Sequence, residues 1–390
     1  MKKVTKAVSI VLLVVLLLFS AALAEWDGVT PIDFEKYPEE DRIYIGVSTG
    51  ITGSNPLEGE AAVTACTLAC EIINEVEGGV NGKKLYPVIV DDSYTTEGAY
   101  TGVSKLVANE RVVALAGPSR SNCCVAVSDL VKAAKIPQVS TGTTPTFYEL
   151  DNPYLFRANS SDTVCAAAVA NFAVDDLQPT VLGIMYTTDD YGIQAYNVIR
   201  ETVDAKGMKH VDQAFNTGDK DYTGQILNIM GAGANVIIVW GHSEDMAIAI
   251  RQIKELGFEG NIISNTGVTG DTFHSLVSEE ICDGIYAQAT VLYDENNEVQ
   301  MAFREAYEKR FGEPATDHAI AQYNTILCIY EALKIAEEPT REGIWKALSQ
   351  IEFMSTIGPF ACDEKRDYFN NTYIVVNNGY TPVLIGMVEG

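Results

Sequence analysis

The stretch VVALAGPSRSNCCVAVSDLVKAAKIPQVSTGTTP, residues 112–145, indicates the fold of the chain. Residues 112–116 are a short apolar run typical of a buried strand, residues 124–134 have the apolar spacing of a helix, and residues 136–139 suit a second strand. A strand, a helix and a strand in this order form a unit in which the strands run parallel and the helix covers one face of the sheet. The stretch therefore predicts an α/β fold.

The same alternation extends along most of the chain. It predicts further helices at residues 60–76, 99–109, 161–174, 191–206, 222–230 and 245–256. It predicts further strands at residues 43–47, 85–90, 181–186, 236–240, 262–264 and 285–289. Because the pattern restarts after residue 160, we expect two lobes, each with a doubly wound parallel sheet covered by helices on both faces.

The loops that follow the predicted strands are rich in Ser, Thr, Gly and Asn. In open α/β sheets, ligands bind at the carboxyl ends of the strands, and hydroxyl and amide groups there suit a small polar ligand. The sequence therefore predicts a binding site built from residues 48–55, 91–94, 117–123, 140–145, 186–191, 241–244 and 264–269.

The first 24 residues have the features of a secretory signal peptide. Lys2 and Lys3 precede an apolar run at residues 8–19, and Ala22-Leu23-Ala24 is a small-residue cleavage signal. The run is short for a membrane span, although a retained anchor is the alternative. No cysteine adjoins the cleavage site, so we expect a secreted or periplasmic protein without a lipid anchor there. Residues 25–40, rich in acid and proline, are predicted to form a loose leader.

The charge and the cysteines exclude several classes of function. The formal net charge is −26, and removal of the three lysines before residue 25 takes it to −29, which would repel a phosphate backbone and argues against nucleic acid as a partner. The eight cysteines lie mostly in apolar helical text, which is typical of small buried side chains. A metal cluster of Cys66, Cys70, Cys123 and Cys124 lacks the usual spacing, so no metal or other cofactor is expected.

Motifs that carry chemistry are incomplete. Gly231-Ala232-Gly233 precedes a strand instead of following one, residues 78–84 lack the spacing of a phosphate loop, and residues 117–121 are not a nucleophile elbow. The four histidines form no metal-binding pattern. The sequence predicts no catalytic residue, and an enzyme remains only as an alternative that a turnover assay would reveal.

Several short motifs in a fixed order identify a family. In chain order, the motifs are Gly50-Ile51-Thr52-Gly53 and residues 74–82, 90–92, 116–119, 136–143, 190–192, 221–222, 357–360 and Asp363. Together they resemble the leucine/isoleucine/valine-binding family of periplasmic proteins, the branched-chain amino acid and amide substrate-binding components of ABC importers. The resemblance covers nearly all of residues 41–390.

The resemblance implies a type I periplasmic-binding-protein fold, with two lobes joined by three crossovers of the chain. It places lobe 1 at residues 41–160 plus 290–365, and lobe 2 at residues 161–289 plus 366–390. It also implies a solute-binding protein whose closed form is recognised by ABC permease subunits. A sensory module of the same fold that reports to a signalling partner is the alternative, and neighbouring permease and ATPase genes would distinguish the two.

The resemblance also assigns the groups that hold the amino-acid end of a ligand. It gives the ligand carboxylate to Ser121, which a plain helix N-cap would also explain. It gives the carboxylate and amino groups to Thr143 and Thr144. The usual acid for the ligand ammonium is replaced by Thr266, which carries no charge. Asp162 is expected to supply that charge instead, unless it only caps the helix that follows, in which case amides or aromatic acids become the expected ligands.

The remaining predicted residues surround the rest of the ligand. Tyr191 is expected to close lobe 2 over the ligand, with an aromatic face and a polar tip. The resemblance places His242 and His318 along the ligand side chain, and exposed loop positions are the alternative. Arg120 can meet an acidic ligand group or point to solvent. Asn55, in the first loop, is a further candidate.

Overall fold

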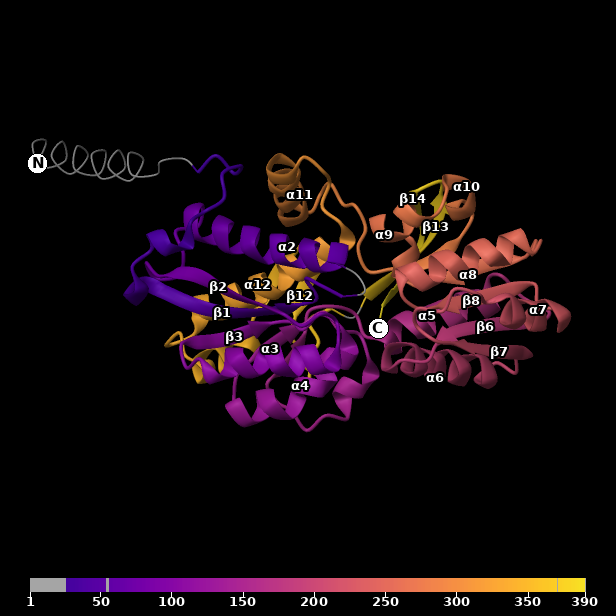
Figure 1. Cartoon of the computed structure of the whole chain (residues 1–390), viewed down its shortest axis with the longest axis horizontal. Helices are drawn as coiled ribbons and strands as arrows, with labels where there is room; N and C mark the ends of the chain where they lie inside the picture. Colours follow the sequence, from indigo (N-terminus) through magenta and orange to yellow (C-terminus); the bar gives the residue numbers. More distant parts are fainter. Residues whose placement is uncertain (1–25, 54–55, 370, 390) are drawn as a thin grey trace, which may run out of the picture.

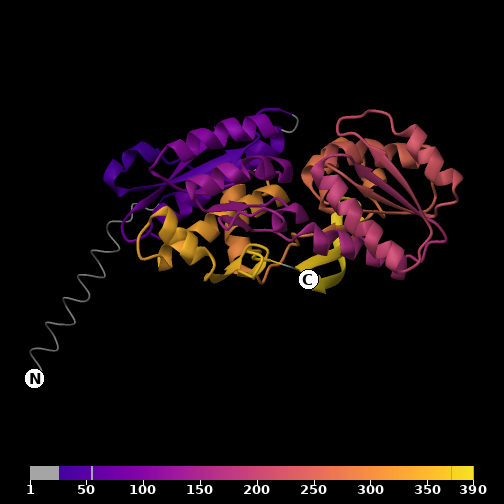
Figure 2. The ribbon, with the colours of Figure 1, turned by 90° about the horizontal axis from the view of Figure 1, so that it is seen from below.

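The computed structural model describes residues 26–53, 56–369 and 371–389, and in these residues the chain forms two lobes side by side (Figure 1). Each lobe is built on one β-sheet with helices on both faces, as the view from below also shows (Figure 2). The predicted α/β fold with two sheet-based lobes is confirmed.

The first lobe contains a fully parallel sheet of five strands in the order β2-β1-β3-β4-β5. Seven of the eight residues of β1 are buried, which is typical of a parallel strand covered on both faces. The strands are β1 (Arg42–Thr49), β2 (Lys84–Asp91), β3 (Val112–Ala116), β4 (Gln138–Ser140) and β5 (Leu155–Arg157).

Alternate side chains of β1 enter two different cores of the first lobe. Ile43 and Ile45 pack against α2 (Pro56–Glu75) and α12 (Asp317–Ile335), whereas Tyr44 packs against α3 (Thr96–Ala108) and α4 (Ser121–Ala134). The sequence that supplies α12 is far from α2, yet the two helices lie together over the sheet (Figure 1). This lobe also holds α11 (Glu298–Phe311), α13 (Arg341–Leu348) and a hairpin of β11 (Glu352–Ser355) and β12 (Gly358–Ala361).

The second lobe contains a sheet of seven strands in the order β14-β13-β10-β9-β8-β6-β7. Five of them run parallel, as expected, and β13 and β14, which the sequence pattern did not indicate, form an antiparallel hairpin at one edge. The strands are β6 (Leu182–Thr187), β7 (His210–Phe215), β8 (Val236–Trp240), β9 (Asn261–Ser264), β10 (Tyr286–Ala289), β13 (Asn371–Asn378) and β14 (Thr381–Glu389).

Two apolar cores cover the two faces of this second sheet. One contains α5 (Asp162–Asp175) and α6 (Asp190–Ala205). The other contains α7 (Thr223–Gly231), α8 (Ser243–Glu255), α9 (Asp271–Leu276) and α10 (Glu279–Cys282). All five residues of β8 are buried between these cores.

The chain passes between the two sheets three times, after β5, after β10 and after β12. Arg157 and Asp367 join the first and third crossovers through an ion pair of 3.1 Å between Nε and Oδ1, and their side chains are 1% and 3% exposed. The backbone of Arg157 also bonds to Arg366 and Tyr368. The three predicted crossovers are therefore present, while the lobe boundaries given above stay a prediction.

The leader is not loose in the part that the structure describes. The Ile32 backbone N–H donates to Glu71 of α2 at 2.8 Å, and Arg310 of α11 donates to the carbonyl of Val29. Arg310 also forms an ion pair with Glu71 at 3.0 Å, and both side chains are largely buried. These contacts fix residues 26–41 on α2 and α11, so the expectation of a loose segment is wrong. The predicted signal peptide lies outside the described residues.

The eight cysteines follow the expectation of buried apolar side chains. All are free thiols in the structure, and all are buried except Cys362, which is partly buried. Burial raises the pKa of the Cys66 and Cys362 thiols to about 12, so neither is a ready nucleophile.

Candidate ligand-binding site

A cavity of about 160 Å³ lies between the lobes and is lined by both of them. We call it the polar pocket. The first lobe contributes loops that follow β3 and β4, and the second contributes loops that follow β6, β8 and β9, as the strand-end rule predicts. Its lining consists of Glu58, residues 119–122, residues 141–143, Asp189, Tyr191, residues 241–243 and residues 265–267.

A second cavity, of about 480 Å³, adjoins the polar pocket and shares Glu58, Ser243, Thr266 and Gly267 with it. We call it the acidic chamber, because its lining includes the carboxyl groups of Glu58, Glu60, Asp271, Glu313 and Asp317. The two cavities together form one cleft between the lobes.

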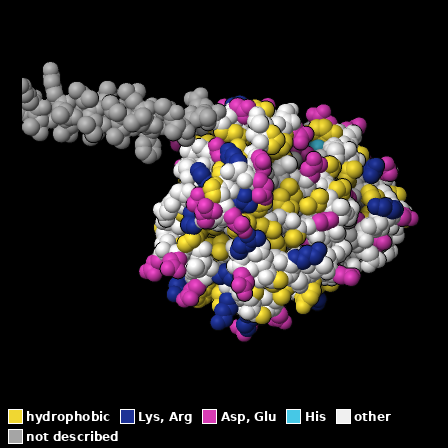
Figure 3. Space-filling model, turned by 60° about the vertical axis from the view of Figure 1, so that its left-hand side comes forward, with side chains coloured by type: hydrophobic (Ala, Val, Ile, Leu, Met, Phe, Trp, Pro, Cys, Tyr) yellow, Lys and Arg dark blue, Asp and Glu magenta, His cyan; other side chains and the backbone are white. Residues whose placement is uncertain are grey.

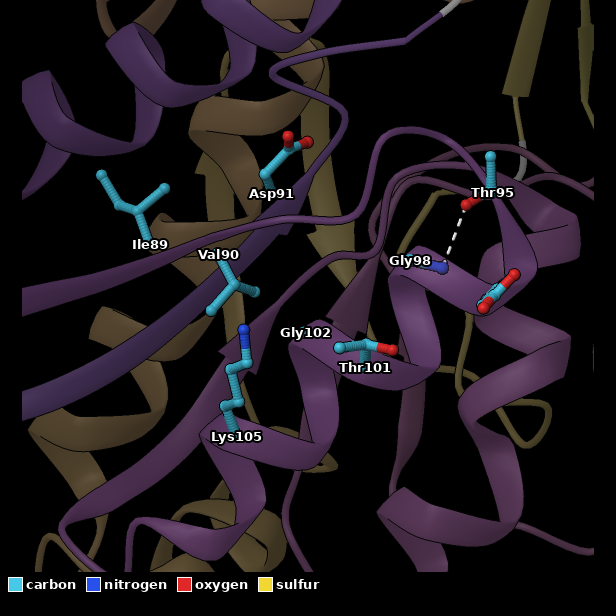
Figure 4. A pocket seen from close by; sticks show the side chains of 9 residues that line it. Ile89, Val90, Asp91, Thr95, Gly98, Thr101, Gly102 and Lys105 are labelled. Atoms are coloured by element: carbon cyan, nitrogen blue, oxygen red, sulfur yellow. Dashed lines mark hydrogen bonds between the residues drawn. The ribbon is translucent and has the colours of Figure 1, made fainter.

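A third hollow lies apart from this cleft, beside β2 at the edge of the first sheet, and Figure 4 shows the residues that line it. It has a volume of about 650 Å³ and is lined by β2 and α3, from Ile89 to Lys105, with no residue of the second lobe. The hydrogen bond drawn there, from Gly98 N to Thr95 Oγ1 at 3.0 Å, is an ordinary helix cap. Its larger volume therefore does not make it the better candidate.

Ser121 connects two loops of the first lobe. Helix α4 begins at Ser121 with Arg120 at the N-cap, so the alternative that Ser121 is the cap is wrong. The Ser121 hydroxyl instead accepts the backbone N–H groups of Thr143, at 3.2 Å, and Thr144, at 3.3 Å. A Cβ at Gly142 would lie 3.3 Å from Ser121 Cα and 2.9 Å from a ring carbon of Phe147, so a larger residue here would have to displace the Phe147 ring.

The first turn of α4 adds an electropositive surface to the polar pocket. Arg120 provides no side-chain cap, and the first turn contains no acidic residue. The exposed N–H groups of a helix N-terminus together with its dipole favour a bound anion. Ser121 and Asn122, at this turn, both line the pocket.

Asp162 lies directly behind Thr143. The Thr143 hydroxyl donates to Asp162 Oδ2 at 2.9 Å, and the Asp162 backbone N–H donates to the Thr143 carbonyl at 2.8 Å. Ser161 caps α5, which makes the alternative that Asp162 is the cap wrong. Burial raises the pKa of the Asp162 carboxyl to about 7, although the bond from Thr143 and the charge of Arg157 oppose the rise.

Arg157 holds the loop that carries Thr143 and Thr144. Its guanidinium donates to the Thr143 carbonyl at 2.9 Å and to the Thr144 carbonyl at 3.3 Å. Thr143 lines the polar pocket, whereas Thr144 and Asp162 are buried behind its wall and do not line either cavity. The hinge and the pocket wall are therefore one connected structure.

The opposite wall of the polar pocket comes from the second lobe. His242 Nε2 lies 2.6 Å from Asp189 Oδ2, and the ring of Tyr191 stacks on His242 with 5.3 Å between centroids. Asp189 also caps α6 through the Gly192 N–H at 2.9 Å. Burial acts to raise the pKa of Asp189, but the bond and charge of His242 outweigh it and hold that pKa below its usual value.

Arg120 faces a partner that the sequence did not suggest. Its guanidinium lies 3.4 Å from Glu58 of α2 and 4.2 Å from the ring centroid of Tyr94. Both charged side chains of the pair are largely buried. Arg120 therefore points into the cleft beside a carboxylate, and not into solvent.

Thr266 and His318 mark the passage from the polar pocket to the acidic chamber. Thr266 lines both cavities, and His318 lines the chamber. Thr266 Oγ1 and His318 Nε2 are buried atoms without a hydrogen-bond partner. Burial lowers the pKa of His318, which favours the neutral form of its imidazole.

The structure thus brings most of the predicted residues to one cleft. Arg120, Ser121, Thr143, Tyr191, His242, Thr266 and His318 line it. Asn55 lies outside the described residues. The sequence did not single out Glu58, Asp189, Asp271 or Asp317. Of these four, only Asp189 lies in a loop that follows a predicted strand, so only its position in the sequence pointed to the site.

Comparison with known proteins agrees with this architecture. The family model described as periplasmic binding protein matches residues 42–377. The leucine-, isoleucine-, valine-, threonine- and alanine-binding protein of Pseudomonas aeruginosa is 23% identical over 86% of this chain and 89% of its own length. Leu/Ile/Val-binding protein homolog 1 of Brucella abortus is 23% identical over 83% of this chain and 87% of its own length.

Solved structures share the fold over their whole length. The leucine-binding protein LivK of Thermotoga maritima has a TM-score of 0.82 at 20% identity and covers 89% of this chain and 99% of its own. LivJ of Streptococcus pneumoniae in complex with isoleucine has a TM-score of 0.82 at 22% identity, and the match covers 90% of this chain and 100% of LivJ. A solute-binding protein of Rhodopseudomonas palustris in complex with 3,4-dihydroxybenzoic acid has a TM-score of 0.79 at 20% identity, and the match covers 90% of this chain and 98% of that protein.

Proposed function

This chain belongs to the periplasmic binding protein family, and we propose that it captures a small amino acid or amino-acid-like ligand between its two lobes for an ABC importer. The observation that carries this proposal is the polar pocket itself. A helix N-terminus and hydroxyl groups of one lobe face Tyr191 and His242 of the other across a cavity of about 160 Å³. The named ligands of the relatives, which include leucine and isoleucine, support the amino-acid class.

The first lobe binds the amino-acid end in this proposal. The ligand carboxylate lies at the N-terminus of α4 and accepts from Ser121 or the adjacent backbone N–H groups. Thr143 receives the ammonium, and Asp162, 2.9 Å behind the Thr143 hydroxyl, supplies the negative charge. A bound ammonium would lower the pKa of Asp162 from about 7 and ionise it. Thr144 supports the loop from behind.

The second lobe completes the site when the protein closes. Tyr191 and His242 cover the ligand, and Thr266, His318 and Arg120 line the path of its side chain. Ligand that bridges both walls favours the closed form over the open one. Closure excludes water and strengthens the polar contacts, because charges interact more strongly in a medium of lower dielectric constant.

Export and delivery belong to the same proposal. The predicted signal peptide directs the chain out of the cytoplasm. Outside it, a membrane permease recognises the closed form. None of the helices in the described part of the chain is both long enough and apolar enough to cross a membrane. Acidic side chains, with Lys and Arg among them, are spread over the face shown in Figure 3, as on a solvated surface.

A second candidate ligand is an aromatic acid. Two of the structural neighbours contain 3,4-dihydroxybenzoic acid and benzoate. Such a ligand would use the same carboxylate site at α4 but would need no counter-ion, so Asp162 would have no role in its recognition.

A thermal-shift screen over amino acids, their amides and aromatic acids tests the proposal. A ligand present at 100 times its Kd stabilises the folded state by about 2.7 kcal/mol and raises the melting temperature. We expect at least one amino acid to do so. The proposal fails if only aromatic acids, or no compound of the three classes, shifts the transition.

A further inference from the structure

The acidic chamber has a one-sided charge. Five carboxyl groups line it, from Glu58, Glu60, Asp271, Glu313 and Asp317, and its described lining contains no Lys or Arg. Glu58 forms an ion pair with Arg120 of the polar pocket at 3.4 Å, so the other four carboxyl groups carry the excess negative charge. The chamber opens into the polar pocket at Thr266. A ligand whose amino-acid end lies at Ser121 would therefore extend its side chain toward these carboxyl groups.

Asp317 joins the two lobes at this chamber. It is the first residue of α12 in the first lobe, and it accepts a hydrogen bond from Thr269 Oγ1 of the second lobe at 3.4 Å. Asp271, the first residue of α9, approaches from the second lobe. Burial raises the pKa of Asp317 to about 7, and the charge of Asp271 adds to the rise, while Arg304 of α11 opposes it.

Two buried polar atoms indicate that the chamber receives polar groups. His318 and Thr266 line it, and the Nε2 atom of His318 and the Oγ1 atom of Thr266 are buried without a hydrogen-bond partner. A buried polar atom left unpaired costs free energy, so such atoms are normally satisfied by protein, water or ligand. A neutral imidazole and a threonine hydroxyl can both accept a hydrogen bond from a ligand N–H.

An aliphatic side chain would fit this lining poorly. It would displace water from several carboxylates and return no hydrogen bond, which is costly for charged groups. A cation would instead form charge-assisted hydrogen bonds with them. It would also offset the repulsion between Asp271 and Asp317, which come from opposite lobes, and so favour closure.

We propose that the ligand carries a second positive group, a guanidinium or an ammonium, at the end away from its carboxylate, and that the acidic chamber binds this group. The proposal rests on the proposed function, since the polar pocket must hold the amino-acid end. It assigns the basic amino acids as the substrate class, in contrast to the aliphatic ligands named for several relatives.

Calorimetric titration of the full mature chain with matched ligands tests this assignment. L-Arginine and L-citrulline differ mainly in the charge of the distal group, and L-norleucine lacks the distal ammonium of L-lysine. We expect arginine or lysine to bind at least about tenfold more tightly than its neutral counterpart, as the loss of one charge-assisted bond implies. Citrulline, norleucine or leucine binding as tightly as the cations would overturn the inference and leave the proposed function intact. If no amino acid binds, both this inference and the proposed function are wrong.

A variant pair locates the effect in the chamber. Asp317→Asn keeps the shape of the side chain and removes its charge, and we expect it to weaken binding of the basic amino acid about tenfold while leaving citrulline unchanged. Glu308→Gln, an exposed change on α11 outside both cavities, is the control and should leave both affinities unchanged. Equal loss for cationic and neutral ligands in Asp317→Asn would show a structural role only and contradict the inference. Thermal melts of the free variants confirm that both fold.

Discussion

The polar pocket and the acidic chamber adjoin in one cleft, yet their linings differ. At the α4 end of the pocket, hydroxyls and the helix N-terminus favour a carboxylate, whereas the chamber has four carboxyl groups of its own and shares that of Glu58 with the pocket. A ligand with unlike charged ends can enter this cleft in one orientation only. The difference teaches that position along the cleft, and not the overall charge of −26, decides what each part can bind.

The two parts also differ in how they are held together. The first-lobe wall of the pocket is assembled within that lobe, because Ser121 and Arg157 both bond to the loop of Thr143 and Thr144. The chamber is formed where Asp271 and Asp317 approach from different lobes. The first-lobe wall of the pocket is therefore expected to persist in an open form, while the second-lobe wall and the chamber depend on closure.

The largest effect is expected from Arg157→Met, which removes the support of the pocket. The change leaves the buried carboxylate of Asp367 unpaired and frees the carbonyls of Thr143 and Thr144. Breaking a buried ion pair on one side costs about 3–5 kcal/mol of unfolding free energy. Urea denaturation measures this loss. Arg200→Met removes an exposed pair with Asp204 and should cost less than about 1 kcal/mol. Equal costs for both variants would contradict a special role for the hinge pair.

Ser121→Ala should measure the contribution of the polar pocket to ligand affinity, since the change leaves the acidic chamber intact. It removes an acceptor from two backbone N–H groups and a donor from the carboxylate site, and we expect affinity for the ligand to fall by about 1.5–3 kcal/mol in calorimetry. Ser104→Ala, a partly exposed position of α3 outside both cavities, is the matched control and should change nothing. An unchanged affinity in Ser121→Ala would exclude this site for the carboxylate.

The pH dependence of stability should reveal Asp162. Its pKa in the folded state, about 7, lies above that of an unfolded aspartate, so its protonated form stabilises the fold at low pH and the contribution is lost as the pH rises toward 7. We expect Asp162→Asn to reduce the loss of unfolding free energy between pH 5 and pH 8 by about 1–2 kcal/mol in ligand-free protein. The facing groups Thr143, Arg157, Asp189 and Asp190 stay unchanged. An identical pH profile for both proteins would contradict the assignment.

The smallest effect is expected from His242→Gln on the second-lobe wall. The change removes the bond to Asp189 and the stacking partner of Tyr191, but the first-lobe wall remains intact. A partly exposed pair of this kind contributes about 0.2–1 kcal/mol, so we expect a loss of affinity of no more than about fivefold. A loss as large as that of Ser121→Ala would show that the second-lobe wall contributes as much to binding as the first-lobe wall, and would contradict this ranking.

The fold could be predicted wherever the apolar pattern is strong. The run at residues 236–240 is entirely apolar, and it is a strand buried on both faces. Strand β7 was missed because His210 to Phe215 mixes polar and apolar residues along an edge of the sheet. The docking of the leader was missed for another reason: it depends on Glu71, a charged residue that only the tertiary structure pairs with Arg310 and the Ile32 N–H.

The site could be predicted where it follows the ends of strands. Ser121, Thr143 and His242 lie in such loops, and the structure brings them to one cavity. Asp271 and Asp317 could not be predicted, because each begins a helix, where an acid is common for local reasons. Their approach from opposite lobes is a property of the assembled fold and leaves no trace in the local sequence.

The radius of gyration in solution, measured by small-angle X-ray scattering with and without saturating ligand, tests the central claim most directly. The ligand is the amino acid that gives the largest thermal shift. We expect the radius to decrease on binding, because the ligand joins the two walls of the cleft and favours the closed form. Tight binding with an unchanged radius would contradict closure of the lobes around the ligand.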